Sequence, residues 1–306
     1  MRERDLTTLE WSKIQERLAG YTAFPWGAEK ARALRPSRDP EEVRDRLGEE
    51  ARRWLAEEPG FDLGGVRDLR PLLVAARHGA ALTPSDLLAV LDTLRAARRI
   101  RRALLRRREA LPRLARHADR MREFPELEAE LERCLDEGGE VKDDASPLLR
   151  HLRAEIRRLG QEIQARLQVY LTDPRYAPYL QEPLITLRNG RFVLPVKAEH
   201  RGKIPGLVHD TSASGATLFV EPLPVVEMGN RWRALQAQEE KEVARILADL
   251  SARVGAQAED LYATLEALAD LDLALAKARY AIALGAERPE IVPWPEEPPE
   301  RRAASP

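Results

Sequence analysis

The chain has 306 residues, of which 33% are charged, and a formal net charge of -1 at pH 7. This length allows one large or two modest domains with a buried core, and the neutral balance excludes a uniformly basic nucleic-acid binder but not a local basic patch. A single cysteine, Cys134, excludes an internal disulfide framework, and the lack of a signal peptide or an apolar run of about 18 residues predicts a cytoplasmic protein.

Residues 1–145 are predicted to form a helical core, or lever, domain. Amphipathic patterns follow one another from residue 7 to about 137, and Pro40 is expected to open one helix that continues through residue 58. Thr-Pro-Ser-Asp at residues 83–86 offers an N-cap, a proline for the first helical position and an acid for the first turn. Each of these patterns predicts a separate helix of the core.

Eight arginines lie between residues 95 and 108, spread around the helix that follows this start signal. Two interpretations stay open. Either these arginines form a second contact to phosphate or ribosomal RNA, or acids from residues 123–137 pair with them across a helical hairpin. We favour the pairing, because exposed ion pairs form readily although each is weak. The candidate residues of this secondary basic patch are Arg98, Arg101, Arg102 and Arg106.

A long helix is predicted after the core. Apolar residues recur at steps of three and four from Leu149 to Tyr170, which is typical of a coiled-coil seam about 22 residues long. Asp173-Pro174 ends the pattern. Residues 146–182 are therefore expected to form an outgoing arm helix.

A second, longer helix is predicted in residues 223–288. Its apolar stripe runs from Trp232 to Leu275 and weakens at the charged Glu239. The helix is expected to return along the first and rejoin the core, and residues 289–306 are expected to be a disordered proline-rich tail. The predicted fold class is mainly α, with an antiparallel two-helix arm that carries a small antiparallel β clamp.

The β clamp is predicted in residues 183–222, between these two helices. Alternating apolar residues flank Asn189-Gly190, a pair that tolerates the positive φ angles of a type I′ hairpin turn. That turn places Arg188 and Arg191 opposite each other on the two strands. Five cations and two acids lie between residues 183 and 220, so the region is basic within a nearly neutral chain.

The polar residues of this β region are the candidate contacts to nucleic-acid phosphates. Phosphate contacts position a protein without reading sequence, and they weaken steeply with salt. The two serines either donate hydrogen bonds to phosphate or belong to an ordinary polar loop. The competing interpretation is a solvated hairpin whose arginines only aid solubility. The candidate residues are Arg188, Arg191, Lys197, Arg201, Lys203, Ser212 and Ser214.

Catalytic and metal sites are not expected in this chain. His200 and His209 lie nine residues apart without a third ligand nearby, so structural roles are the default. The acidic doublets Asp143-Asp144 and Glu239-Glu240 are isolated, and no nucleophile and base come together around them.

The stretch from Tyr179 to Pro222, with the QEEKEVARIL helix after it, resembles the bacterial MutS type-II family, paralogues of the mismatch-repair protein MutS. The resemblance extends over about residues 5–290. It implies a lever domain and a two-helix arm whose clamp embraces nucleic acid. It also implies an ATP-driven dimer that binds branched DNA and suppresses recombination, with a C-terminal Smr nuclease domain in many members and a role in sensing and splitting collided ribosomes.

One feature of the full-length family is missing from the sequence. The family's ATPase needs a Gly-x-x-x-x-Gly-Lys-Ser/Thr loop, whose amides and lysine hold phosphate. Here Gly202-Lys203 precedes Ile204, and no glycine lies five residues before Gly202. We therefore expect no ATP or Mg²⁺ site and no nuclease in this chain, as for an expressed fragment or a truncated product.

The predicted function is that of the nucleic-acid-binding core and clamp of an ATP-driven homodimer that acts on branched or duplex DNA. The alternative is an arm that binds the ribosome, rRNA or another protein in the rescue of collided ribosomes. A third interpretation is a structural piece without binding of its own. Salt-sensitive binding that is lost with the charges of the β region favours nucleic acid, whereas salt-insensitive association favours a protein partner. No membrane partner is expected.

Overall fold

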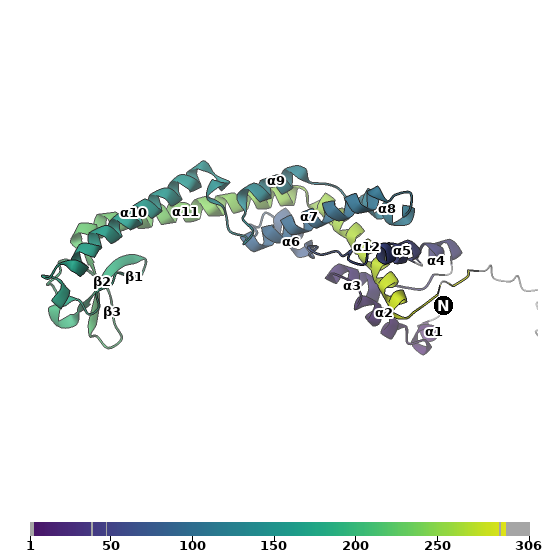
Figure 1. Cartoon of the computed structure of the whole chain (residues 1–306), viewed down its shortest axis with the longest axis horizontal. Helices are drawn as coiled ribbons and strands as arrows, with labels where there is room; N and C mark the ends of the chain where they lie inside the picture. Colours follow the sequence, from purple (N-terminus) through teal and green to yellow (C-terminus); the bar gives the residue numbers. More distant parts are fainter. Residues whose placement is uncertain (1–2, 38, 47, 288, 292–306) are drawn as a thin grey trace, which may run out of the picture. The chain divides into compact units, whose positions relative to one another are not determined.

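The computed structural model of the chain describes residues 3–37, 39–46, 48–287 and 289–291. It is mainly helical with one four-stranded antiparallel sheet, which confirms the predicted fold class at this level (Figure 1). The chain divides into two compact units, each described by itself. Unit 1 contains the part up to Glu132 and the part from Ser251, and unit 2 runs from Arg133 to Leu250. Most of the predicted tail, residues 292–306, lies outside the described residues.

Unit 1 is a helical domain built around its last helix, α12 (Ala258–Ala283). Apolar side chains lie on several sides of α12, as expected for a central helix, and Leu268, Leu271 and Leu275 are fully buried. Helices α2, α3, α5, α6 and α8 all contact it. None of the helices in the described part of the chain is both long and apolar enough to cross a membrane. The N-terminal part contains the helices α1 (Glu3–Thr8), α2 (Trp11–Ala19), α3 (Pro25–Arg32), α4 (Pro40–Arg46), α5 (Glu49–Glu57), α6 (Arg70–Arg77), α7 (Pro84–Arg106), α8 (Pro112–Arg120) and α9 (Pro125–Cys134). The last two residues of α9 belong to unit 2.

The start signals of these helices were predicted well, but their lengths were not. Thr83 and Asp86 form the expected capping box at the start of α7, where the Thr83 hydroxyl accepts a hydrogen bond from the Asp86 N–H at 3.2 Å. The single helix expected from Pro40 is two helices, α4 and α5, because Gly48 adopts a left-handed conformation (φ 70°) that interrupts it.

A buried carboxylate joins α12 to the start of α3. Asp272 is 0% exposed, and its carboxylate accepts hydrogen bonds from the backbone N–H groups of Ala23, at 2.9 Å, and Phe24, at 3.3 Å. A Cβ at Gly27 would lie 2.1 Å from Asp272 Oδ2, so only glycine lets α3 approach the carboxylate this closely. Burial raises the pKa of Asp272 to about 6, although both N–H groups and Arg279 oppose the shift.

Unit 2 contains two antiparallel helices, α10 (Pro147–Thr172) and most of α11 (Leu223–Ala256). Three polar contacts fix their register: Ser146 donates to Glu242 at 2.7 Å, Arg153 pairs with Glu239 at 2.9 Å, and the Trp232 indole donates to the Ile156 carbonyl at 3.1 Å. As residue numbers increase along α10, the numbers of their partners in α11 decrease, as expected for antiparallel helices. Glu239, which weakens the apolar stripe in the sequence, serves as one of these polar contacts.

The predicted returning helix is divided in the structure. α11 and α12 meet at Gln257, whose φ and ψ of -106° and 11° are not helical. Just before this break, a Cβ at Gly255 would lie 2.5 Å from the carbonyl oxygen of Ala76. The end of α11 thus packs backbone to backbone on the end of α6, within unit 1.

The four-stranded sheet of unit 2 has the order β1-β2-β4-β3, with β1 (Thr186–Arg188), β2 (Arg191–Lys197), β3 (Gly206–Thr211) and β4 (Thr217–Pro222). β1 pairs with the first half of β2, and β4 pairs with the second half, with Leu194 opposite Val220. The Asn189 side chain also donates to the carbonyl of His209 in β3 at 3.2 Å. This bond joins the β1–β2 turn to the opposite edge strand.

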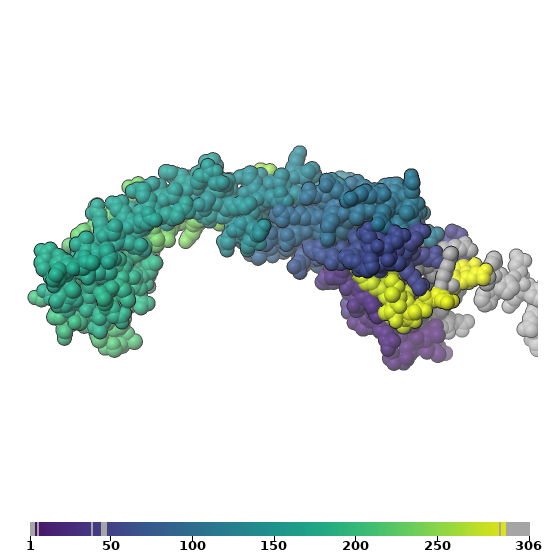
Figure 2. Space-filling view, in the orientation of Figure 1, coloured from purple at the N-terminus to yellow at the C-terminus, as the bar shows by residue number. Residues whose placement is uncertain are grey.

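One face of the sheet packs on α10. Most of the predicted apolar stripe of α10 is buried, and Ile156 and Tyr170 are partly buried. Its second half, Leu159, Ile163 and Leu167, forms a core with strand residues and not only with a second helix. Figure 2 shows this part of unit 2 as one closely packed lobe. Gly160 leaves room for the Trp232 indole, whose nitrogen would lie 3.3 Å from a Cβ there. The other buried residues of this core are Leu180, Phe192, Leu194, Val196, Ile204, Leu218, Val220, Val225 and Trp232.

Glu242→Gln is expected to destabilise unit 2 by on the order of 1–2 kcal/mol at neutral pH, a magnitude reduced by the solvent exposure of Arg245. Hydrogen bonds from Arg245 and then Ser146 lower the pKa of Glu242 to about 2. Because the pKa is lowered, the Glu242 carboxylate stabilises the fold at pH values above its ordinary pKa of 4.5. This stabilisation is lost as the pH falls toward 2. Urea denaturation at neutral pH and at about pH 3 should therefore show a smaller difference between the two proteins in acid. An equal difference at both pH values would contradict this account.

Candidate nucleic-acid interface

The β1–β2 turn has the predicted conformation. Asn189 (φ 50°) and Gly190 (φ 71°) are both left-handed, as a type I′ turn requires, and Arg188 and Arg191 are cross-strand partners. The local sequence therefore determined both the turn and the position of the two arginines. The directions of their side chains depend on the rest of the unit.

Arg191 lies in a buried polar cluster with Glu221 of β4. The Glu221 side chain is 1% exposed and that of Arg191 is 14% exposed, and Nη1 of Arg191 lies 3.3 Å from Oε1 of Glu221. Arg191 Nη2 also donates to Asn230 of α11 at 2.6 Å. Backbone packing closes the cluster, since a Cβ at Gly229 would lie 2.3 Å from Glu221 Oε1. This placement gives Arg191 a structural task, and its predicted contact with phosphate stays untested.

His209 completes this cluster from the edge strand. The register of β3 against β4 shifts between Val208 and Asp210, so His209 is the extra residue of a β-bulge. Its Nε2 lies 2.6 Å from Glu221 Oε2. The bulge thus turns His209 toward the buried carboxylate, and β2, β3, β4 and α11 all contribute to one polar cluster.

Arg188 is exposed on the strand opposite Arg191. Its guanidinium carbon lies 4.4 Å from the centre of the Phe219 ring, a cation–π distance. Phe219 is only 9% exposed, so this ring is a fixed support for the guanidinium. A guanidinium that stacks on a ring can still donate its in-plane N–H groups to an anion.

The other predicted cations lie at the end of β2 and in the connection that follows it. Lys197 donates to the carbonyl of Pro178 at 3.1 Å. Arg201 and Lys203 are exposed in the connection between β2 and β3, next to the buried Ile204. The structure places all three within the sheet unit, and their binding to phosphate stays a prediction.

The two predicted serines serve the β3–β4 turn. Ser212 Oγ accepts the N–H of Thr217 at 3.0 Å, and Ser214 Oγ accepts the N–H of Ala216 at 3.4 Å. Their hydroxyl oxygens lie 3.3 Å apart. Of the two interpretations left open by the sequence, these bonds favour the polar turn.

Three of the four candidate arginines of α7 pair with acids, as favoured from the sequence. Arg98 lies 3.2 Å from Glu128, and Arg101 and Arg102 lie 2.9 and 3.7 Å from Glu123. Arg106 donates to the backbone carbonyl of Arg102. The expected ion pairs with acids of residues 123–137 are confirmed for Arg98, Arg101 and Arg102. A phosphate would have to compete with these carboxylates, and binding by the patch itself is untested.

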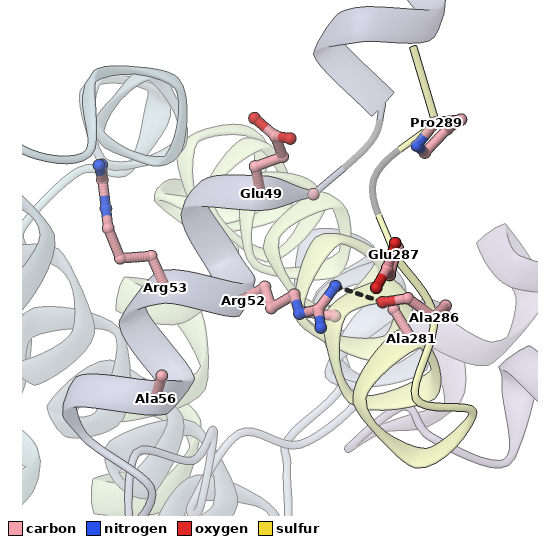
Figure 3. Close-up of a pocket in the computed structure, with 10 residues that line it drawn as sticks. Glu49, Arg52, Arg53, Ala56, Ala281, Ala286, Glu287 and Pro289 are labelled. Carbon is pink, nitrogen blue, oxygen red and sulfur yellow. Dashed lines mark hydrogen bonds between the residues drawn. The ribbon is translucent and has the colours of Figure 1, made fainter.

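A cavity of about 510 Å³ lies in unit 1, between α5 and the end of α12 (Figure 3). Arg52 donates to the Ala286 carbonyl at 2.6 Å, and Arg53 donates to the Ala110 carbonyl. Ala56 and Ala281 provide apolar lining. The guanidiniums that border this cavity thus tie α5 to neighbouring chain segments, and they suggest no particular chemistry.

Sequence reasoning missed the partners of the turn. Glu221, His209 and Asn230 were not predicted to meet Arg191, and Phe219 was not predicted to support Arg188. One signal was available, because Glu221 is an acid at the end of an otherwise apolar strand, TLFVEP. A buried acid of this kind needs a cation or several donors nearby.

The chain is similar to proteins named endonuclease MutS2. It is 45% identical over 297 residues to that of Symbiobacterium thermophilum, 43% over 291 residues to that of Pelotomaculum thermopropionicum, and 46% over 296 residues to that of Geobacillus kaustophilus. The matches cover 96%, 94% and 95% of this chain, but only 37%, 37% and 38% of the relatives. The chain therefore spans somewhat more than a third of their length, and the activity in their names is that of the whole proteins.

A comparison with models of protein families identifies the family of the chain. The model of MutS domain III matches residues 30–278, which include all of unit 2 and most of the described part of unit 1. This match and the relatives confirm the resemblance to MutS type-II proteins. The chain belongs to the MutS domain III family.

Proposed function

We propose that the chain is the core and clamp region of a MutS2-type protein, and that its sheet unit binds the phosphate backbone of DNA. The observation that carries this proposal is the exposed pair Arg188 and Arg201. Neither has a carboxylate partner among the described residues, whereas arginines along α10 such as Arg158 and Arg166 are ion-paired. An unpaired guanidinium does not have to give up a carboxylate before it meets a phosphate.

The proposal extends to the complete protein. There, the region would serve an ATP-driven homodimer that grips branched or duplex DNA in the cytoplasm and suppresses recombination. This part extends the membership of the MutS domain III family and the similarity to proteins named endonuclease MutS2 to the whole protein. Because contacts of this kind read backbone and shape, we expect discrimination between duplex and branched DNA but not between sequences.

Removal of the sheet unit's free cations is expected to weaken DNA binding at least about ten-fold at moderate salt. The test is the triple variant Arg188→Gln/Arg201→Gln/Lys203→Gln, measured by fluorescence anisotropy with labelled duplex, four-way junction and rRNA over a salt series. Each lost phosphate contact should reduce the slope of log affinity against log salt by about 1.

The matched control removes three charges from ion pairs of α10: Arg150→Gln/Arg158→Gln/Arg166→Gln. It is expected to bind with nearly the salt slope of the wild type, because those arginines already have carboxylate partners. If both triple variants lose the same slope, only the net charge matters and the proposed site is wrong.

A protein or ribosome partner is the second candidate. The observation that favours it is a set of exposed apolar side chains on or near the two edge strands: Leu184 (39%), Leu187 (50%), Leu207 (46%) and Val208 (44%). Exposed apolar groups near unpaired strand edges are typical of protein contact sites. Preference for rRNA in the anisotropy series, or association that does not change with salt, would favour this candidate.

A further inference from the structure

The first helical turns of α11 bring another arginine to the β1–β2 turn. Nε of Arg233 lies 3.7 Å from the position that a Cβ of residue 190 would occupy. Gly190 has no side chain and a φ of 71°, so the turn is open on this side and the Arg233 side chain lies against it. Residues 43 positions apart in the sequence thus share one corner of unit 2.

Helix geometry separates Arg233 from its neighbour Arg231. Residues two apart on an α-helix point about 200° apart, so the two arginines lie on opposite sides of the buried Trp232. Arg231 lies on the α10 side, where its Nη2 is 3.7 Å from Glu155. Arg233 lies on the side of the β1–β2 turn, next to the strand that carries Arg188.

The ion pairs of unit 2 single out the same residue. Nine of its arginines have a carboxylate within 4.0 Å, and Arg133 bonds to backbone carbonyls. In this fully described unit, the arginines without a carboxylate partner are Arg188, Arg201 and Arg233. Arg188 lies on β1, Arg201 in the connection between β2 and β3, and Arg233 in the third turn of α11, whereas most arginines of the unit lie on other segments.

We propose that Arg233 of α11 binds a backbone phosphate together with Arg188, in a site that the β1–β2 turn and α11 form around Gly190. This inference rests on the proposed function and extends it from the strands to the helix. It also assigns the second cation of the turn differently from the sequence, because the Arg191 guanidinium is held by Glu221 and Asn230. The ligand is the phosphodiester backbone, and no base is read.

The test is salt-dependent anisotropy of the whole chain with labelled duplex DNA, with single variants at three positions. Arg233→Gln and Arg188→Gln are each expected to reduce the salt slope by about 1 and to weaken binding several-fold at moderate salt. Arg233→Lys should keep most of the slope, since it retains the charge. Arg231→Gln is the matched control, because it removes the same charge two residues away from a position paired with Glu155.

Each outcome decides a different point. If Arg233→Gln matches the wild type while Arg188→Gln loses slope, the inference is wrong and the proposed function stands. An equal loss in Arg231→Gln and Arg233→Gln would show a general effect of charge and would also overturn it. If the wild type shows no salt-sensitive binding, the proposed function and the inference both fail. Circular dichroism melting of all variants tests that the fold is kept.

Discussion

Arg191→Met is expected to lower the free energy of unfolding of unit 2 by about 3–5 kcal/mol. The substitution leaves the Glu221 carboxylate, which is 1% exposed, without its guanidinium partner. His209 would be the remaining side chain in contact with the carboxylate, at 2.6 Å. The measurement is urea denaturation, combined with hydrogen exchange of the amides of β2 and β4 to locate the loss.

Two further variants test this explanation. Arg191→Met/Glu221→Met should recover part of the lost stability, because removing both members of a buried pair costs less than removing one. Arg166→Met is the control at an exposed ion pair, whose side chain is 54% exposed, and is expected to change stability by no more than about 0.5 kcal/mol. If Arg191→Met is no more destabilising than Arg166→Met, the cluster around Glu221 does not stabilise the sheet.

Between about pH 4 and pH 7, the wild type is expected to lose on the order of 2 kcal/mol of stability relative to Asp272→Asn. Burial raises the pKa of Asp272 from 3.8 to about 6, so the folded chain holds this proton more tightly than the unfolded chain. A group with a raised pKa stabilises the fold fully at pH values below its pKa in the unfolded chain. This stabilisation is lost as the pH rises through its pKa in the folded chain. The measurement is urea denaturation of both proteins at several pH values in this window.

Asp270→Asn is the matched control for this pH dependence. Burial opposes ionisation of Asp270 too, but its ion pairs with Lys30 and Arg120 lower its pKa overall. Its contribution should therefore be present above pH 3.8 and change mainly below it. A difference between wild type and Asp272→Asn that stays constant from pH 4 to pH 7 would show that folding does not raise the pKa of Asp272.

The features predicted correctly are those that a few neighbouring residues determine. Asn189-Gly190 permits two left-handed residues in succession, which fixes the turn and puts Arg188 opposite Arg191. Thr83 and Asp86 satisfy the free N–H groups at the start of α7. Asp173-Pro174 ends α10, which stops at Thr172. In each case the interaction is formed within about four residues, so the sequence pattern contains all of it.

The misplaced helix boundaries depend on packing as well as on sequence. Gly48 and Gln257 lie in helical patterns that apolar spacing alone would continue. Near Gln257, the close approach of Gly255 to the Ala76 carbonyl marks a backbone contact between α11 and α6. Such contacts join residues far apart in the sequence, and no local pattern reports them.

The sequence by itself determined the mainly helical class, the β hairpin with its arginines, the buried stripes of the long helices and the resemblance to the MutS family. These follow from periodicity, turn chemistry and residue identity. Only the tertiary structure decided which segments pack on the apolar stripes and which cations have carboxylate partners. Ile163 of the α10 stripe packs in the core that includes the sheet. Arg191 meets Glu221, and Arg233 reaches Gly190. A stripe says that a residue is buried but not against what, and a charge is free or paired only once distant segments have met.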